Sequence, residues 1–336
     1  MNDKIKKRDP LFDNAKGLGI ILLVLGHLFI FGSAPFRVIF AFHMPLFFIV
    51  SGIFLRGNKL KLLAQYLFPY LFFTILSLLI IGIPKVVIGA ENPVNIILVL
   101  CKEFVQKFGL DYVYMGNLWF LVILAIGVCI VEALRKIVSK YRKGNIYLLI
   151  SLMLISVVLV KIPFYVPFLL KTLPMACFWI ALGKIAGKEL ANNVTSISNK
   201  FFFLLLTMFV LFVALNGCVN IGTPVYNDTF LYIFNALLGV SLILWCSNRQ
   251  LPKFVEFIGR NSLYFFASEQ LGRVLVLFLI NYIFHTNYES MVNLPVWLAF
   301  IVLIPVILFG YLFYYTLTPL YTNIFRKIKI KIEKYE

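Results

Sequence analysis

Two ionisable residues stand inside the first long apolar run of this sequence. Lys16 and His27 both belong to "DNAKGLGIILLVLGHLFIF", residues 13–31, and lie eleven positions apart. Eleven residues of α-helix make three turns and about 20° more, so the two side chains share one face, about 16.5 Å apart along the axis. A lysine at the centre of a membrane helix costs roughly 2.5–3.5 kcal/mol, and less near its ends. Because an ionisable side chain in the membrane is unfavourable, we expect this helix face to form part of a functional site.

A second histidine is expected at the same depth as His27. The next apolar run, "FRVIFAFHMPLFFIVSG", follows after a short turn and contains His43. Counting residues from that turn puts the two imidazoles within roughly 5 Å of the same level. Pro45 removes a backbone hydrogen bond just past His43 and is expected to open the helix there. A single intramembrane histidine often serves only to hydrogen-bond between helices, but the pair beside Lys16 favours a site. Imidazole is the side chain best suited to general base catalysis near neutral pH.

A second pair of charges lies near the C-terminus, in "NSLYFFASEQLGRVL", residues 261–275. Glu269 and Arg273 are four residues apart and therefore share one helix face. Two interpretations stay open: a structural ion pair that neutralises itself, or groups that line an internal cavity. Asp13, three residues before Lys16, is placed to orient the lysine. Ser51 and Gly52 are typical of close helix packing.

The composition shows which solvent surrounds these residues. Hydrophobic residues make up 62% of the 336, charged residues 13%, and the mean hydropathy is +0.95. Too little polar surface remains to cover a soluble globule of this size. We therefore expect an all-α, polytopic membrane protein with about ten membrane-spanning helices. The expected spans lie near 13–31, 36–55, 66–88, 117–134, 146–162, 167–187, 201–217, 229–247, 262–284 and 296–316.

Charge predicts the orientation of these spans. With both termini in the cytoplasm, the inner segments hold 23 of the 31 Lys and Arg, as expected for cytoplasmic loops. Six more lie on the outer side or at the outer ends of helices, and only two, Lys16 and Arg273, remain in the interior of spans; the six are Arg37, Lys85, Lys102, Lys107, Lys161 and Lys171. The net charge of +17 then follows from topology and from anionic lipid, and it gives no reason to expect nucleic acid as a partner. Trp119 is expected to anchor the start of its span at the outer interface.

The rest of the chain adds no second domain. We expect a single membrane-embedded domain over 1–336, with an amphipathic helix on the outer face within 89–116. The N-terminal run has some features of a signal peptide, but nine further spans and its buried charges argue against cleavage. Cys101 and Cys218 share the outer side, which permits a disulfide. The sequence shows no metal-binding spacing.

Several motifs resemble one known family. The runs "FDNAKGLGIILLVLGH" and "FAFHMPLFFIVSGIFL" are similar to the opening of the acyltransferase 3 family of integral membrane acyltransferases. The signature of that family is a basic residue, ten residues and a histidine, matched here by Lys16 and His27. Weaker matches are "NLWFL" at 117–121, "FWIALGKIAGK" at 178–188 and "FIGRNSLYFF" at 257–266. Relatives often carry a histidine where this chain has Glu269, so no role is carried over to that residue.

The resemblance implies a membrane-bound O-acyltransferase. Such enzymes move an acyl group, usually acetyl, from cytoplasmic acyl-CoA to a sugar hydroxyl of a cell-surface polysaccharide or its lipid-linked precursor. No bound cofactor is implied, and the partners are acyl-CoA, a glycan acceptor and the lipid bilayer of a bacterial cytoplasmic membrane. We expect His27 and His43 to be the catalytic residues, and Lys16 and Asp13 to bind the donor. Further candidates to line the cavity are Glu269, Arg273, Trp119, Asn117 and Ser51.

Two other classes of membrane protein stay open. In a ten-helix transporter or flippase for a glycan or small anionic solute, the same charged residues would line a translocation path. Transporters often have two related halves or paired broken helices, and this sequence shows neither. A glycan polymerase would more naturally carry a larger outer loop than 89–116.

The predicted topology can be tested by labelling single cysteines. Cysteines placed at Gly57 and Ser139 should react with an impermeant reagent only from the cytoplasm, and one at Asn287 only from outside, because the alternation of Lys and Arg requires it. Labelling of the Asn287 cysteine from the cytoplasm would overturn the arrangement of ten spans.

Overall fold

The computed structural model describes residues 9–56, 59–83, 87, 92, 94, 98, 116–162, 168–285 and 294–333. Helices occupy most of these ranges, and only isolated β-bridges occur within them, which confirms the all-α prediction. In chain order, the helical segments are α1 (Pro10–Leu28), α2 (Ala34–Phe40), α3 (His43–Ile53), α4 (Lys59–Ser77), the π-helix η1 (Leu78–Gly82), the 3-10 turn η3 (Gly116–Leu118), α7 (Trp119–Val138), α8 (Gly144–Lys161), α9 (Phe168–Thr195), α10 (Asn199–Asn216), α11 (Thr229–Ser247), α12 (Lys253–Arg260), α13 (Ser262–Phe284) and α14 (Val296–Glu333).

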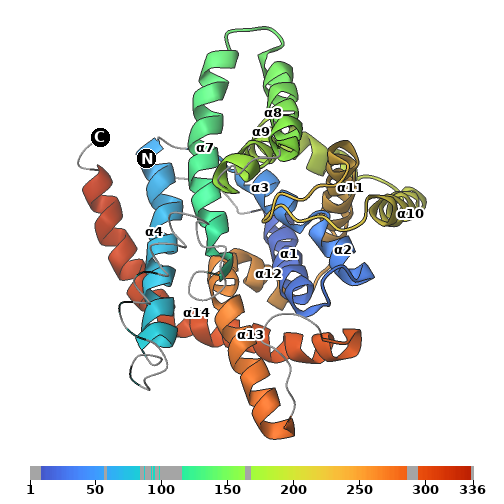
Figure 1. Ribbon diagram of the computed structural model, residues 1–336. Helices are drawn as coiled ribbons and strands as arrows, with labels where there is room; N and C mark the ends of the chain where they lie inside the picture. The colour runs from blue at the N-terminus through green and yellow to red at the C-terminus, as the bar shows by residue number, and fades with distance from the viewer. Residues whose placement is uncertain are drawn as a thin grey trace.

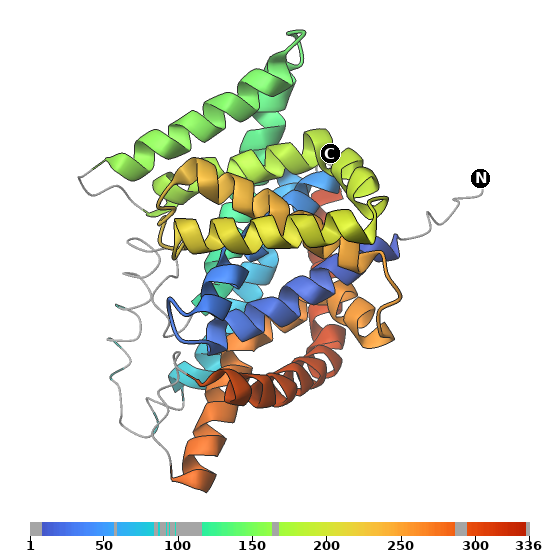
Figure 2. The ribbon, with the colours of Figure 1, turned by 90° about the vertical axis from the view of Figure 1, so that its right-hand side faces the viewer.

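Helix α1 lies at the centre of the structure. It contacts α2, α3, α11, α12, α13 and α14, and Figure 2 shows it between α11 on one side and α14 on the other. Asp9 caps the helix by accepting a hydrogen bond from the Leu11 N–H, and Pro10 stands at the first helical position, where its missing N–H is not needed. Lys16 and His27 are therefore held in one continuous helix, as predicted, although α1 ends at Leu28 rather than at residue 31.

The second predicted span, 36–55, is interrupted. Helix α2 ends at Phe40 and α3 begins at His43, so the break falls at Ala41 and Phe42. Pro45 has no N–H to pair with the carbonyl four residues earlier, which belongs to Ala41. The interruption thus lies just before His43, not just past it as predicted, and it makes that residue the first of a new helix.

Close backbone contact fixes α3 against α9. A side chain at Gly52 would overlap the carbonyl oxygen of Ile180, and one at Gly183 would overlap that of Ile49. Small residues at facing positions let two helices approach until their backbones touch, which is how helices associate where no hydrophobic force drives them together. The prediction that Gly52 marks close packing is confirmed. The same contact fixes the height of α3, and with it His43.

Each of the ten predicted spans overlaps a helix of the structure. Eight stretches of the described residues are long and apolar enough to cross a bilayer, and they coincide with eight predicted spans. Helices α7 and α9 cover the other two predicted spans, 117–134 and 167–187, but are not among the eight. The chain is thus a polytopic helical membrane protein, while its count of ten crossings and the cytoplasmic location of its termini remain predictions.

The last helix departs most from its prediction. The span 296–316 forms only the first part of α14, which continues to Glu333 and contains Pro305 and Pro319. Proline within a helix removes a hydrogen bond and bends it, and Figure 1 shows α14 changing direction along its length. The second part of α14 packs against α4, where the ring of Phe68 on α4 contacts the rings of Tyr321 and Phe325 on α14.

Two predictions fall largely outside the described residues. These are the amphipathic helix within 89–116 and a disulfide that involves Cys101. The prediction that the N-terminal run is not a cleaved signal peptide involves residues 1–8, which also lie outside the described ranges.

The contact between α3 and α9 gives a stability prediction. Gly183→Val should lower the free energy of unfolding by about 1–3 kcal/mol, the usual cost of overpacking, because the new methyl groups collide with backbone rather than with a side chain that can turn away. The measurement is thermal melting of the purified protein in detergent. Leu170→Val, on the same helix but 51% exposed, is the control and should leave the melting temperature nearly unchanged. Equal melting temperatures for both variants would contradict this account.

Candidate active site

The buried carboxylate of Glu269 is the centre of a polar cluster between three helical segments. Glu269 lies on α13, and its side chain is fully buried. Its Oε1 atom lies 2.9 Å from Nε of Arg273, one turn further along the same helix. The same oxygen lies 3.2 Å from Nδ1 of His27 on α1. The predicted ion pair between Glu269 and Arg273 is thus present, and the glutamate also reaches the histidine.

Asn117 completes the cluster from a third element. It lies in η3, the turn that precedes α7, and its Nδ2 donates a hydrogen bond of 2.7 Å to Oε2 of Glu269. The same amide nitrogen lies 3.3 Å from His27 Nδ1. Both carboxylate oxygens therefore have partners, as a buried charge requires. The four side chains of this cluster are those of His27, Asn117, Glu269 and Arg273. The fold thus brings together three segments that lie far apart in the sequence.

His27 is partly accessible, unlike Glu269 and Arg273 of the same cluster. It lies in the last turn of α1, and 19% of its side-chain surface is exposed. Its Nδ1 atom faces Glu269 and Asn117. A neutral imidazole that donates from one ring nitrogen has a lone pair on the other. This arrangement suits a base whose orientation is fixed by a carboxylate.

His43 lies close by but is bound differently. Its Nδ1 atom lies 2.9 Å from the carbonyl oxygen of Ile39, and only 3% of the residue is exposed. The ring of Phe40 lies edge-on to both histidines, with centroid distances of 6.0 Å to His27 and 4.7 Å to His43. The two histidines thus contact the same aromatic ring, which suits the predicted common layer, and His43 supports His27 through Phe40 rather than directly.

The other end of α1 carries a second charged cluster. Lys16 Nζ lies 2.8 Å from Asp13 Oδ1, and Nε of Arg260 lies 3.6 Å from Asp13 Oδ2. Arg260 also pairs with Glu256, which lies one turn earlier on α12. Asp13 is 2% exposed, so it is a buried anion between two cations. Sequence reasoning paired Asp13 with Lys16 but did not identify Arg260, which belongs to a segment expected to be an inner loop.

The pairing of Asp13 with Arg260 depends on two glycines. A side chain at Gly17 would overlap the carbonyl oxygen of Val255, and one at Gly259 would overlap that of Asp13 itself. Helix α12 is therefore pressed against the first turns of α1. This contact places Arg260 beside Asp13 and fixes the end of α1 that carries Lys16.

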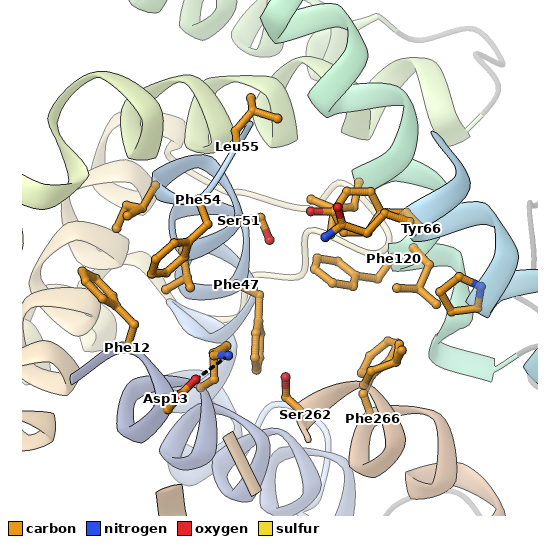
Figure 3. Close-up of a pocket in the computed structure, with 18 of the residues that line it drawn as sticks. Phe12, Asp13, Phe47, Ser51, Phe54, Leu55, Tyr66, Phe120, Ser262 and Phe266 are labelled. Atoms are coloured by element: carbon orange, nitrogen blue, oxygen red, sulfur yellow. Dashed lines mark ion pairs between the residues drawn. The ribbon is translucent and has the colours of Figure 1, made fainter. Parts of the chain in front are cut away.

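A large cavity opens beside Lys16. Its volume is about 750 Å³, and its walls come from α1, α3, α4, α7, α9, α13 and α14. Figure 3 shows the aromatic side chains Phe12, Phe47, Phe120 and Phe266 around this space. The charged residues that line it are Asp9, Asp13, Lys16, Arg56 and Lys188. The cavity thus combines an apolar interior with three cations and two carboxylates on its wall, and Arg56 and Lys188 were not predicted as site residues.

The predicted site residues divide between this cavity and the Glu269 cluster. Lys16, Asp13 and Ser51 line the large cavity. Glu269, Arg273 and Asn117 form the cluster with His27. A small cavity of about 10 Å³ lies on the other side of Asn117, between α4, η3 and α13. Trp119 is 8% exposed and its indole lies against the backbone at Gly222, so it is a packed residue beneath the loop 217–228.

Comparison with known proteins places these features in one family. The sequence model of the acyltransferase domain of the acyltransferase 3 family matches residues 10–315. The chain is 42% identical to the nodulation protein NolL of Sinorhizobium fredii (strain NBRC 101917 / NGR234) over an alignment of 64 positions, which covers 16% of this chain and 18% of that protein. No solved structure matches the chain. The family match includes α1, both histidines of the site and the Glu269 cluster, and the chain therefore belongs to the acyltransferase 3 family of membrane acyltransferases.

Proposed function

We propose that this protein transfers an acetyl group from cytoplasmic acetyl-CoA to a sugar hydroxyl of a cell-surface polysaccharide or its lipid-linked precursor. The observation that carries the proposal is the geometry along α1. One end of the helix presents a cation to a large cavity, and the other end presents a histidine oriented by a buried carboxylate. Family membership supplies the class of reaction. The work takes place in a bacterial cytoplasmic membrane, with ten crossings, both termini inside and one membrane-embedded domain.

The donor is assigned to the large cavity. Acyl-CoA carries several phosphate charges at one end and a long, flexible arm that ends in a thioester. Lys16, Arg56 and Lys188 supply cations at the wall of the cavity, where phosphates pair with ammonium and guanidinium groups. The aromatic and aliphatic interior accommodates the arm. Asp13 keeps the ammonium of Lys16 in place, since their atoms are 2.8 Å apart.

The transfer is assigned to His27. Its Nδ1–H donates to Glu269, which leaves the lone pair of Nε2 for the acceptor hydroxyl. His27 removes the hydroxyl proton while the oxygen bonds to the thioester carbonyl carbon. The carbon–sulfur bond then breaks, and the proton passes to the departing thiolate. Glu269 holds the positively charged imidazole, while Arg273 and Asn117 keep the carboxylate in position. His43 positions His27 through Phe40.

The base role of His27 predicts the result of a single isosteric change. His27→Gln keeps a hydrogen-bonding side chain but cannot take a proton near neutral pH. Transfer from labelled acetyl-CoA to cell-surface glycan precursors, measured with purified protein in liposomes, should fall by about 10²–10⁴. A packing role would lose only about 0.6 kcal/mol, the average for a hydrogen bond within a membrane.

The control for this change is His285→Gln, the same substitution at the exposed end of α13. It should transfer acetyl as the wild type does. A folded His27→Gln protein that retains more than about a tenth of wild-type transfer would remove His27 from the role of base. Absence of transfer by the wild type with every acyl-CoA and glycan supplied would argue against the proposed function itself.

The donor role of Lys16 predicts a different kinetic change. Lys16→Ala removes a partner of the donor phosphates, so KM for acetyl-CoA should rise about tenfold or more while kcat stays within a few-fold. Lys253→Ala, an exposed lysine of α12, is the matched control and should leave both constants unchanged. A loss confined to kcat would contradict the assignment, because it would place Lys16 in the chemical step.

A further inference from the structure

Four cations gather beside the ends of α3 and α7, on the predicted cytoplasmic side. Lys184 and Lys188 are four residues apart on α9 and therefore share one helix face. Arg135 lies in the last turn of α7, and Arg56 follows the end of α3. The ammonium of Lys184 is repelled by the other three cations and attracted by the carboxylate of Glu132. The four basic side chains, here called the inner cation cluster, thus outnumber the carboxylate beside them.

The contact between α3 and α9 holds this cluster together. Nζ of Lys184 donates a hydrogen bond to the carbonyl oxygen of Leu55, just past the end of α3. A side chain at Gly187 would collide with that of Ile53, so the two helices touch here as well as at the glycines described above. An ammonium group has three N–H donors, and the contact with Leu55 uses one. The basic face of α9 and the end of α3 that carries Arg56 are therefore fixed against each other.

Arg135 adds a guanidinium group whose hydrogen-bonding capacity is not used. Its Nε atom is buried, and the part of the chain that the structure describes offers this atom no hydrogen-bond partner. A buried donor without a partner costs free energy, and more so when the group is charged. Lys136, the next residue of α7, is exposed instead. The unused donor and the repulsion among the four cations both favour an anion at this place.

The inner cation cluster borders the large cavity. Arg56 and Lys188 line the cavity wall, and so does Leu55, which accepts the hydrogen bond described above. Figure 3 shows Leu55 at one edge of that space. On α1, by contrast, the ammonium of Lys16 is paired with the carboxylate of Asp13. The cavity wall thus has two cationic regions, one balanced by a carboxylate and one with more cations than carboxylates.

We infer that the inner cation cluster binds the 3′-phosphate of acyl-CoA and so selects a free CoA thioester as the donor. This phosphate is a monoester that carries up to two negative charges, and it forms charge-assisted hydrogen bonds with ammonium and guanidinium groups. An acyl carrier protein presents its acyl group on the same phosphopantetheine arm but has no 3′-phosphate, so it lacks this contact. The inference rests on the proposed function and names the class of its donor.

The test compares CoA with dephospho-CoA, which lacks only the 3′-phosphate. Dissociation constants are measured by isothermal titration calorimetry with purified protein in nanodiscs of neutral phosphatidylcholine. The wild type should bind CoA about 10–100-fold more tightly than dephospho-CoA, the usual effect of hydrogen bonds to a charged group. Arg135→Gln and Lys188→Gln should each reduce this ratio by about three- to tenfold, because each removes one partner of the phosphate. Their affinity for dephospho-CoA should stay near that of the wild type.

Two further variants separate this site from its surroundings. Lys136→Gln, the same loss of charge at the exposed neighbour of Arg135, is the matched control and should leave the ratio unchanged. Lys16→Ala should weaken the binding of both compounds alike, since Lys16 belongs to the other cationic region of the cavity wall. Lys188 is exposed, so Lys188→Gln tests the inference even where Arg135→Gln does not fold.

The phosphate of an anionic lipid headgroup has related chemistry, and the composition of the nanodiscs distinguishes it from the donor. Under the inference, added phosphatidylglycerol leaves the preference for CoA in place. If phosphatidylglycerol raises the melting temperature of the wild type but not of Lys188→Gln, and CoA is not preferred, the cluster binds lipid and the inference is overturned. Equal affinity for CoA and dephospho-CoA in a wild type that transfers acetyl would also overturn it, while the proposed function would stand. A wild type that binds neither compound and transfers no acyl group would instead count against the proposed function.

Discussion

The buried carboxylate of Glu269 is the interaction on which the proposed site depends. A carboxylate removed from water is tolerated only when its oxygens are paired, and here Arg273, Asn117 and His27 supply the partners. These partners come from α1, η3 and α13, so the requirement to satisfy one charge also fixes three segments relative to each other. The orientation of the His27 ring is a result of the same requirement. In the proposed mechanism, burial of the charge thus has a catalytic use as well as an energetic cost.

Helix α1 connects this cluster with the large cavity. Its central position, in contact with six other helices, keeps both ends in fixed surroundings. At one end, Gly17 and Gly259 let α12 approach until Arg260 reaches Asp13. At the other end, the interrupted α2 and α3 place Phe40 and His43 beside His27. A rigid helix with well-defined ends suits a reaction whose donor is long and whose reacting atoms must meet at one point.

Much of this architecture could be predicted from local patterns. The spans 229–247 and 262–284 coincide with α11 and α13, and the pairing of Glu269 with Arg273 follows from a separation of four residues. The spacing of Lys16 and His27 likewise needs only the helical repeat. The partners of Glu269 on other helices could not be predicted, because Asn117 is 152 residues away in the sequence and the contact exists only after folding. Arg56 carried no signal beyond membership of an inner, positively charged segment, while Lys188 and Arg260 stood only within the weaker family motifs 178–188 and 257–266, which gave no indication of their partners. Pro45 predicted a break just past His43, but the break lies before the histidine, because the carbonyl that loses its donor is that of Ala41.

Three aromatic rings on the wall of the large cavity, those of Phe47, Phe120 and Phe266, have a consequence for the membrane itself. In the proposed orientation the large cavity faces the cytoplasm, and the accessible side of His27 lies toward the outer half of the bilayer. An open passage between them would conduct protons and small ions, and would dissipate the gradients that a cytoplasmic membrane maintains. Three packed aromatic rings offer no polar groups to hydrate an ion, and burial of a charge among them would be costly. Rings of this kind on the wall of the large cavity accommodate an apolar chain deep in the bilayer but disfavour the entry of ions.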